Sequence, residues 1–71
     1  MDAERGTILA NGESREIELP CSVADFLKSC SYKSTQVVIE YNGNVLERKS
    51  LGTVMLRNGD QLEVIVPVAG G

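Results

Sequence analysis

The chain has 71 residues, enough for one domain near the lower size limit for a core that folds without a metal or disulfides. Ten acidic residues against seven basic ones give a net charge of -3, and the scattered basic residues argue against a nucleic-acid partner. No apolar run approaches the roughly 20 residues that span a bilayer, and no secretory signal is recognisable. We therefore expect a soluble cytoplasmic protein with no membrane contact.

The two cysteines, Cys21 and Cys30, match no redox or zinc motif at their spacing, and the chain has no histidine. Their density is far below that of a disulfide-framed mini-protein. We expect free thiols and no metal site. Without a nucleophile and base pair, catalysis by the chain's own side chains is not expected, so the protein is not predicted to be an enzyme.

The first elements in chain order form a predicted β-hairpin. Residues 1–6 are small and polar and are expected to fray. Residues 7–10 read as a short strand, Asn11 and Gly12 give a strong turn signal, and residues 15–19 alternate as a second strand.

A helix from residue 23 to residue 29 or 30 follows this hairpin, because apolar residues recur there at helical spacing. Pro20 has no N–H to donate and ends the preceding strand. Ser22 can accept from a free N–H at the helix start, and Asp25 in the first turn suits the helix dipole.

The second half of the chain predicts three more strands. Residues 37–41 alternate, an Asn-Gly turn leads into a brief strand at residues 44–46, and residues 51–54 form an irregular link. A tight turn at residues 58–60 precedes the final strand, residues 61–68. In that strand we place Leu62, Val64 and Val66 on one face and Glu63, Ile65 and Pro67 on the other.

This order of elements is that of an α+β fold, the ubiquitin-like β-grasp, in which a mixed sheet of four to five strands packs on one main helix. An open α+β sandwich with the same elements remains the competing architecture. We expect a single domain over residues 1–71, with residues 67–71 as a C-terminal tail. The final strand is the longest and most apolar and should be central, which would anchor the tail on the stiffest part of the domain.

The tail ends in Gly70 and Gly71. Two residues without Cβ atoms make a slim, extended segment that can thread a narrow tunnel. A terminal carboxylate is inert until it is activated, so the tail implies a partner that activates it.

Several segments, taken in order, resemble one family of proteins. The segments are residues 11–13, 22–27, 37–48, 56–64 and the final Gly70 and Gly71. Together they resemble the small sulfur-carrier proteins of thiamine thiazole synthesis, the ThiS family, over residues 7–71. Residues 66–71 also resemble the small subunit of molybdopterin synthase, MoaD, which stays an alternative. Cys21 departs from the family's usual glycine before the helix, and no function is assigned to it.

The resemblance implies a reaction at Gly71. An E1-like adenylyltransferase, ThiF-like, would use ATP and magnesium to adenylate its carboxylate. A sulfur donor such as a cysteine desulfurase relay would then convert it to a thiocarboxylate, and a ThiG-like thiazole synthase would receive the sulfur. The chain itself would bind no cofactor. Gly70, Ala69, Val68 and Pro67 would thread into the partner.

A partner surface is expected beside this tail. Ile65 and Val38 are predicted to point outward as an apolar patch, and Asp60 and Glu63 could meet basic residues of a partner. A ubiquitin-related modifier conjugated through Gly71 remains an alternative function, as does an interaction module with no tail chemistry. The free protein is expected to be a monomer.

Overall fold

The computed structural model describes residues 4–67 and places in them one five-stranded sheet, one α-helix and two short 3-10 helices. The strands are β1 (Glu4–Ala10), β2 (Glu13–Leu19), β3 (Val38–Tyr41), β4 (Asn44–Leu46) and β5 (Gln61–Ile65). The helix α1 is Val23–Ser29, and the 3-10 helices are η1 (Ser34–Gln36) and η2 (Arg48–Ser50).

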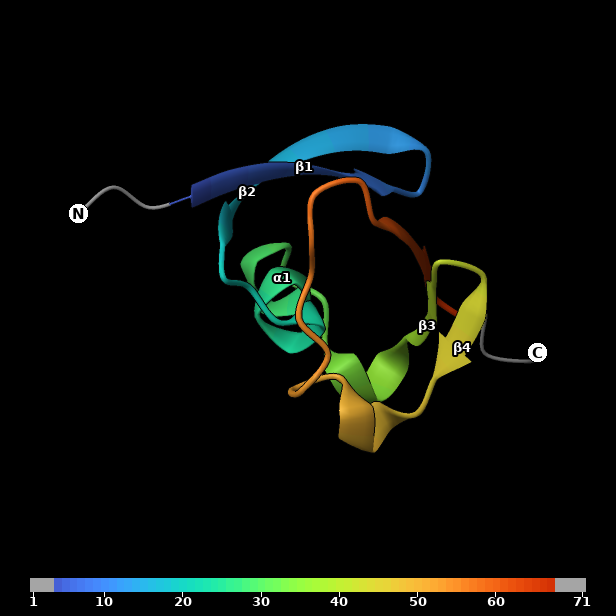
Figure 1. The fold of residues 1–71 in the computed structure, drawn as a ribbon. Helices are drawn as coiled ribbons and strands as arrows, with labels where there is room; N and C mark the ends of the chain where they lie inside the picture. The colour runs from blue at the N-terminus through green and yellow to red at the C-terminus, as the bar shows by residue number, and fades with distance from the viewer. Residues whose placement is uncertain (1–3, 68–71) are drawn as a thin grey trace.

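The strands are ordered β2-β1-β5-β3-β4 across the sheet. β1 and β5 are parallel, and every other neighbouring pair is antiparallel. The sheet curves around α1, which lies on its concave side (Figure 1). The predicted β-grasp architecture is therefore confirmed, and the last strand is central as expected.

The first strand begins earlier than the sequence indicated. β1 pairs with β2 from Glu4, opposite Leu19, onward. The expectation of a frayed segment over residues 1–6 is therefore wrong for residues 4–6; the first three residues lie outside the described part of the chain. Backbone pairing to the long second strand extends β1 where few apolar side chains signal a strand. Gly6 is buried there, and a Cβ atom on it would come within 2.9 Å of the Leu19 Cδ1 atom.

The helix forms where the sequence predicts it. The Ser22 hydroxyl oxygen accepts a hydrogen bond from the Asp25 backbone N–H at 3.0 Å, which satisfies one of the donors that a helix start leaves unpaired. The helix ends at Ser29, Cys30 is its C-cap, and Ser31 follows with a positive φ of 65°. Its buried residues are Val23, Phe26 and Leu27.

The core lies between α1 and the concave face of the sheet. The buried apolar residues are Ile8, Ala10, Val23, Phe26, Leu27, Val37, Ile39, Leu51, Leu56, Leu62 and Val64. They come from β1, α1, β3, β5 and the connections, so each of these segments is fixed by burial of apolar surface.

The long connection from β4 to β5 is fixed against the start of the helix. Leu51 and Leu56 are each only 3% exposed. The Val23 N–H donates to the Val54 carbonyl oxygen at 3.0 Å, and the Leu56 N–H donates to the Cys21 carbonyl oxygen at 2.8 Å. This segment has little regular structure, as predicted, yet backbone hydrogen bonds join it to the start of the helix.

The central strand is shorter than predicted. β5 ends at Ile65, whereas the alternation predicted a strand over residues 61–68. Val38 opposite Ile65 is the first residue of β3, so the pairing ends there, and Pro67 has no N–H with which to continue it. Val66 is 56% exposed and does not share the buried face of the strand, which corrects its predicted placement.

Candidate functional site

The predicted reactive segment follows β5. Pro67 is the last residue that the structure describes, and it is exposed. The predicted site residues Val68, Ala69, Gly70 and Gly71 lie outside the described residues. The candidate site therefore consists of the strand that carries this segment and the surface around Pro67.

β5 is held along both edges. On one side β3 pairs with it, and on the other the Asn11 backbone N–H donates to the Leu62 carbonyl oxygen at 2.9 Å. Beyond the end of β1, the Asn11 side chain continues the pairing, since its Oδ1 accepts from the Val64 N–H at 2.7 Å and its Nδ2 donates to the Val64 carbonyl oxygen at 3.3 Å. The strand before Pro67 thus has hydrogen-bond partners on both sides.

The apolar patch predicted at Val38 and Ile65 is present. The two residues are direct cross-strand partners, and their side chains are 38% and 41% exposed. Val66, which follows Ile65, is also exposed. We define these three residues as the tail-base patch. Sequence alternation identified Val38 and Ile65 but placed Val66 inside.

Glu63 lies next to this patch on the outward face of β5. It is exposed, as predicted, and its cross-strand partner is Glu40 on β3. Like charges directly opposite each other destabilise a sheet slightly, so a partner's cation between them would relieve the repulsion. Glu40 was missed, because its position opposite Glu63 depends on strand register.

Asp60 does not belong to the partner surface. It is 9% exposed, and its Oδ2 accepts from the Tyr41 hydroxyl and from the Arg57 backbone N–H, each at 2.7 Å. Its Oδ1 accepts from the Asn42 side-chain amide at 3.2 Å. The expectation that Asp60 meets basic residues of a partner is wrong, because its carboxylate is committed to bonds that lock the turn before β5 onto β3.

These contacts also shift the pKa values of Asp60 and Tyr41. Burial opposes ionisation of Asp60, but the hydrogen bonds from Tyr41, Arg57 and Asn42 outweigh it and hold the pKa of the carboxyl below its usual value. The hydrogen bond to Asp60 raises the pKa of the Tyr41 hydroxyl, with burial adding to the effect. Asp60 is therefore a charged structural residue at neutral pH.

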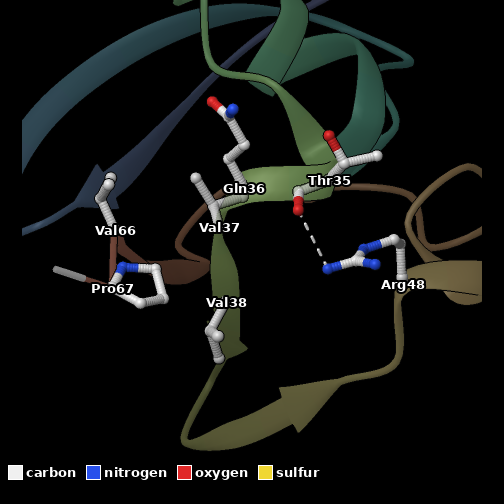
Figure 2. Close-up of a pocket in the computed structure, with 7 residues that line it drawn as sticks. All are labelled: Thr35, Gln36, Val37, Val38, Arg48, Val66 and Pro67. Atoms are coloured by element: carbon white, nitrogen blue, oxygen red, sulfur yellow. Dashed lines mark hydrogen bonds between the residues drawn. The ribbon is translucent and has the colours of Figure 1, made fainter. Parts of the chain in front are cut away.

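A pocket of about 420 Å³ opens where the chain leaves β5 (Figure 2). Its walls are η1 and the start of β3, the residues that follow β5, and Arg48 of η2. The Arg48 Nη2 atom donates to the Thr35 carbonyl oxygen at 3.2 Å. Sequence analysis missed this pocket, since its residues come from three separate segments.

The cysteines lie away from this surface, at the two ends of the helix. Both are half-buried free thiols. The pKa of the Cys21 thiol is raised, chiefly by burial and further by the charges of Asp25 and Cys30. Among residues 4–67 no group of histidine, cysteine, aspartate or glutamate side chains is placed to hold a metal ion. In the same residues, no helix is both long and apolar enough to cross a membrane.

The geometry defines a class of protein: a ubiquitin-like β-grasp domain whose central strand is paired on both edges, is flanked by an exposed apolar patch and precedes a Gly-Gly sequence. The model of the ThiS family matches residues 8–71. The chain belongs to this family of small sulfur-carrier proteins, as the resemblance of its segments predicted.

Similar proteins agree with this assignment. The crystal structure of the thiamine biosynthesis protein ThiS from Geobacter metallireducens has a TM-score of 0.79 and 25% identity, and the alignment covers 92% of this chain and 99% of that one. The uncharacterized protein ycf40 of Trieres chinensis is 28% identical over 92% of this chain and 89% of its own length. A thiazole synthase of Paramagnetospirillum magneticum is 28% identical over 90% of this chain, which spans only 20% of that protein.

Proposed function

We propose that this protein carries sulfur for the synthesis of the thiamine thiazole as a thiocarboxylate on Gly71. The observation that carries the proposal is the family match, which extends through the final Gly70 and Gly71. The likeness to a ThiS structure and to part of a thiazole synthase supports the thiamine pathway over that of molybdopterin.

Formation of the thiocarboxylate would proceed in three steps. The Gly71 carboxylate attacks the α-phosphorus of ATP in a ThiF-like adenylyltransferase with magnesium, and pyrophosphate leaves. The terminal sulfur of a donor persulfide then attacks the carbonyl carbon, and AMP departs with the C–O electron pair. A thiol reduces the resulting acyl disulfide and releases the thiocarboxylate. Adenylation is needed because AMP is a far better leaving group than oxide from a carboxylate.

The described residues support a role as a handle for this chemistry. β5 is paired on both sides, so the strand that leads to Pro67 has a fixed position in the domain. Val38 and Ile65 offer apolar surface beside that position, and Glu63 with Glu40 offers negative charge to a basic partner. We assign the same surface to docking on a ThiG-like thiazole synthase.

The test is the intact mass of the protein purified from its own cells under reducing conditions. A carrier shows the gain expected for one oxygen replaced by sulfur, and tandem fragmentation places that gain on Gly71. Fragment assignment is required, because oxidation at Met or Cys gives nearly the same nominal gain. A variant that lacks Gly71 is the matched control and should show no such gain.

Reconstitution separates this function from its alternatives. The wild-type protein with adenylyltransferase, ATP and a sulfur donor should form the thiocarboxylate and support thiazole formation by thiazole synthase. Transfer of sulfur to a molybdopterin precursor instead would assign the chain to that pathway. Thiol-resistant adducts of higher mass would identify a protein modifier, and no change at Gly71 under these conditions would refute the proposal.

A further inference from the structure

The pocket beside Pro67 has a simple chemical character. Its apolar walls are Val37, Val38, Val66 and Pro67, its polar walls are Thr35 and Gln36, and its single charged group is Arg48. Figure 2 shows the guanidinium on one side of the β3 start and Val66 and Pro67 on the other. A ligand with a negative end and an apolar stem matches this arrangement.

Arg48 is exposed, is oriented by one hydrogen bond and keeps hydrogen-bonding capacity. Its bond to the Thr35 carbonyl oxygen uses one of the five N–H donors of the guanidinium. Within residues 4–67, the ion pair that the structure contains is Lys49 with Glu47, so no carboxylate of this part of the chain neutralises Arg48. A guanidinium that keeps free donors can bind a carboxylate through charge-assisted hydrogen bonds.

The pocket is continuous with the tail-base patch. Val38 and Val66 belong to both, and Pro67 leads directly into the segment that a partner must enclose. The charges on the two sides of the patch have opposite signs, with Glu63 and Glu40 on the sheet and Arg48 at the pocket. On a chain that is acidic as a whole, Arg48 is a local positive charge, which is complementary to an acidic group on a partner.

We propose that the pocket receives an aspartate or glutamate side chain of the adenylating enzyme, which pairs with Arg48 and so selects this carrier before activation. The inference rests on the proposed function and names a contact within it. Adenylation is the first step of the proposed reaction. An enzyme that discriminates between carriers at this step avoids adenylating the C-terminus of another protein. The alternating charges would also fix the carrier's orientation over the enzyme.

The test measures pyrophosphate exchange by the adenylating enzyme at a series of carrier concentrations. Arg48→Glu should raise the KM for the carrier at least about tenfold and leave kcat within about twofold. Arg48→Gln removes the charge without reversing it and should give a smaller increase in KM. Replacing the acidic contact residue of the enzyme by arginine should restore the affinity for Arg48→Glu.

Lys49→Glu is the matched control. It makes the same change of charge at the next residue, but Lys49 is outside the pocket, and its side chain and that of Glu47 are 81% and 74% exposed. It should leave KM within about twofold, because Lys49 does not line the pocket. Urea unfolding of each variant shows that the carriers compared are folded.

The outcomes separate the contact from the function itself. Equal KM values for Arg48→Glu and Lys49→Glu, or an effect that appears only during delivery to thiazole synthase, would overturn the assignment of the pocket. So would saturable binding of inorganic phosphate to the carrier alone that Arg48→Gln abolishes, since the pocket would then be a small-anion site. If the wild-type carrier supports no exchange, the proposed function fails and the contact fails with it.

Discussion

Asp60 should contribute far more to stability than its place in a tight turn suggests. Its carboxylate accepts hydrogen bonds from Tyr41, Arg57 and Asn42 and is almost fully buried. Asp60→Asn keeps the shape of the side chain and exchanges one oxygen for an NH2 group. The substitution therefore measures how much the negative charge and one hydrogen-bond acceptor contribute to stability.

The structure shows why the amide cannot be accommodated in either orientation. An NH2 group in place of Oδ2 would face the Arg57 N–H, and one in place of Oδ1 would face the Asn42 side-chain amide. Asn42 cannot turn its own oxygen inward without loss, because that oxygen accepts from the Gln61 N–H at 2.8 Å. In either orientation two hydrogen-bond donors face each other, and the remaining hydrogen bonds have a neutral acceptor in place of a charged one. We expect the substitution to lower the free energy of unfolding by about 2 to 4 kcal/mol. The whole domain has about 4 to 11 kcal/mol of stability.

Urea and thermal unfolding measure this cost. We expect Tm to fall by at least about 10 °C. Asp25→Asn is the control, since Asp25 is exposed and acts on the helix dipole alone, for less than about 1 kcal/mol. A double-mutant cycle with Tyr41→Phe should give a coupling of about 1 to 2 kcal/mol.

The pH dependence gives an independent check. The pKa of Asp60 is lower in the folded protein than in the unfolded chain, so its contribution is present above the usual carboxyl pKa and is lost as the pH falls through the folded value. The wild-type protein should lose stability from about pH 5 downward more steeply than Asp60→Asn does. Equal slopes, or a cost at neutral pH no larger than that of Asp25→Asn, would refute this account of Asp60.

Three further predictions concern β5 and the segment it carries. Leu62→Ala removes a side chain that is 1% exposed and should cost about 3 kcal/mol or more, measured as a lower urea midpoint; a cost below about 1 kcal/mol would show that the core collapses around the gap. Asn11→Ala removes both side-chain hydrogen bonds to Val64 and adds backbone strain at a φ of 52°. We expect the free energy of unfolding to fall by about 2 kcal/mol and the Val64 amide to exchange faster. Unchanged exchange at Val64 would contradict the role of Asn11. Gly70→Val should abolish adenylation in the exchange assay with an unchanged urea midpoint, and normal adenylation would rule out passage of the tail through a narrow tunnel.

Local signals in the sequence were enough to predict most of the fold. Asn11 and Gly12, like Asn42 and Gly43, adopt positive φ values, the backbone conformation that an Asn-Gly hairpin turn requires. The apolar spacing and the Ser22 cap placed the helix. These features depend on residues close together in the chain, so a pattern of side chains determines them.

The features that sequence analysis missed depend on contacts between distant segments. Aspartate is a common residue in turns, and only the approach of Tyr41 to this turn shows that the Asp60 carboxylate is buried. The pocket requires Arg48 to reach Thr35 across a gap of thirteen residues in the chain. Glu40 faces Glu63 only because of the register of β3 on β5. No local pattern encodes these three arrangements.

The parallel pairing of β1 and β5 has a practical consequence for work with this carrier. Leu9 lies beside Gln61, so the two strands run in the same direction and Glu4 and Ile65 lie at opposite ends of the sheet, separated by about 30 Å. An affinity tag or a second protein joined before Glu4 would start far from the reactive segment and from the pocket beside it. Labelled or immobilised carriers should therefore be made from the N-terminal side, where the attachment leaves the surface around Pro67 open.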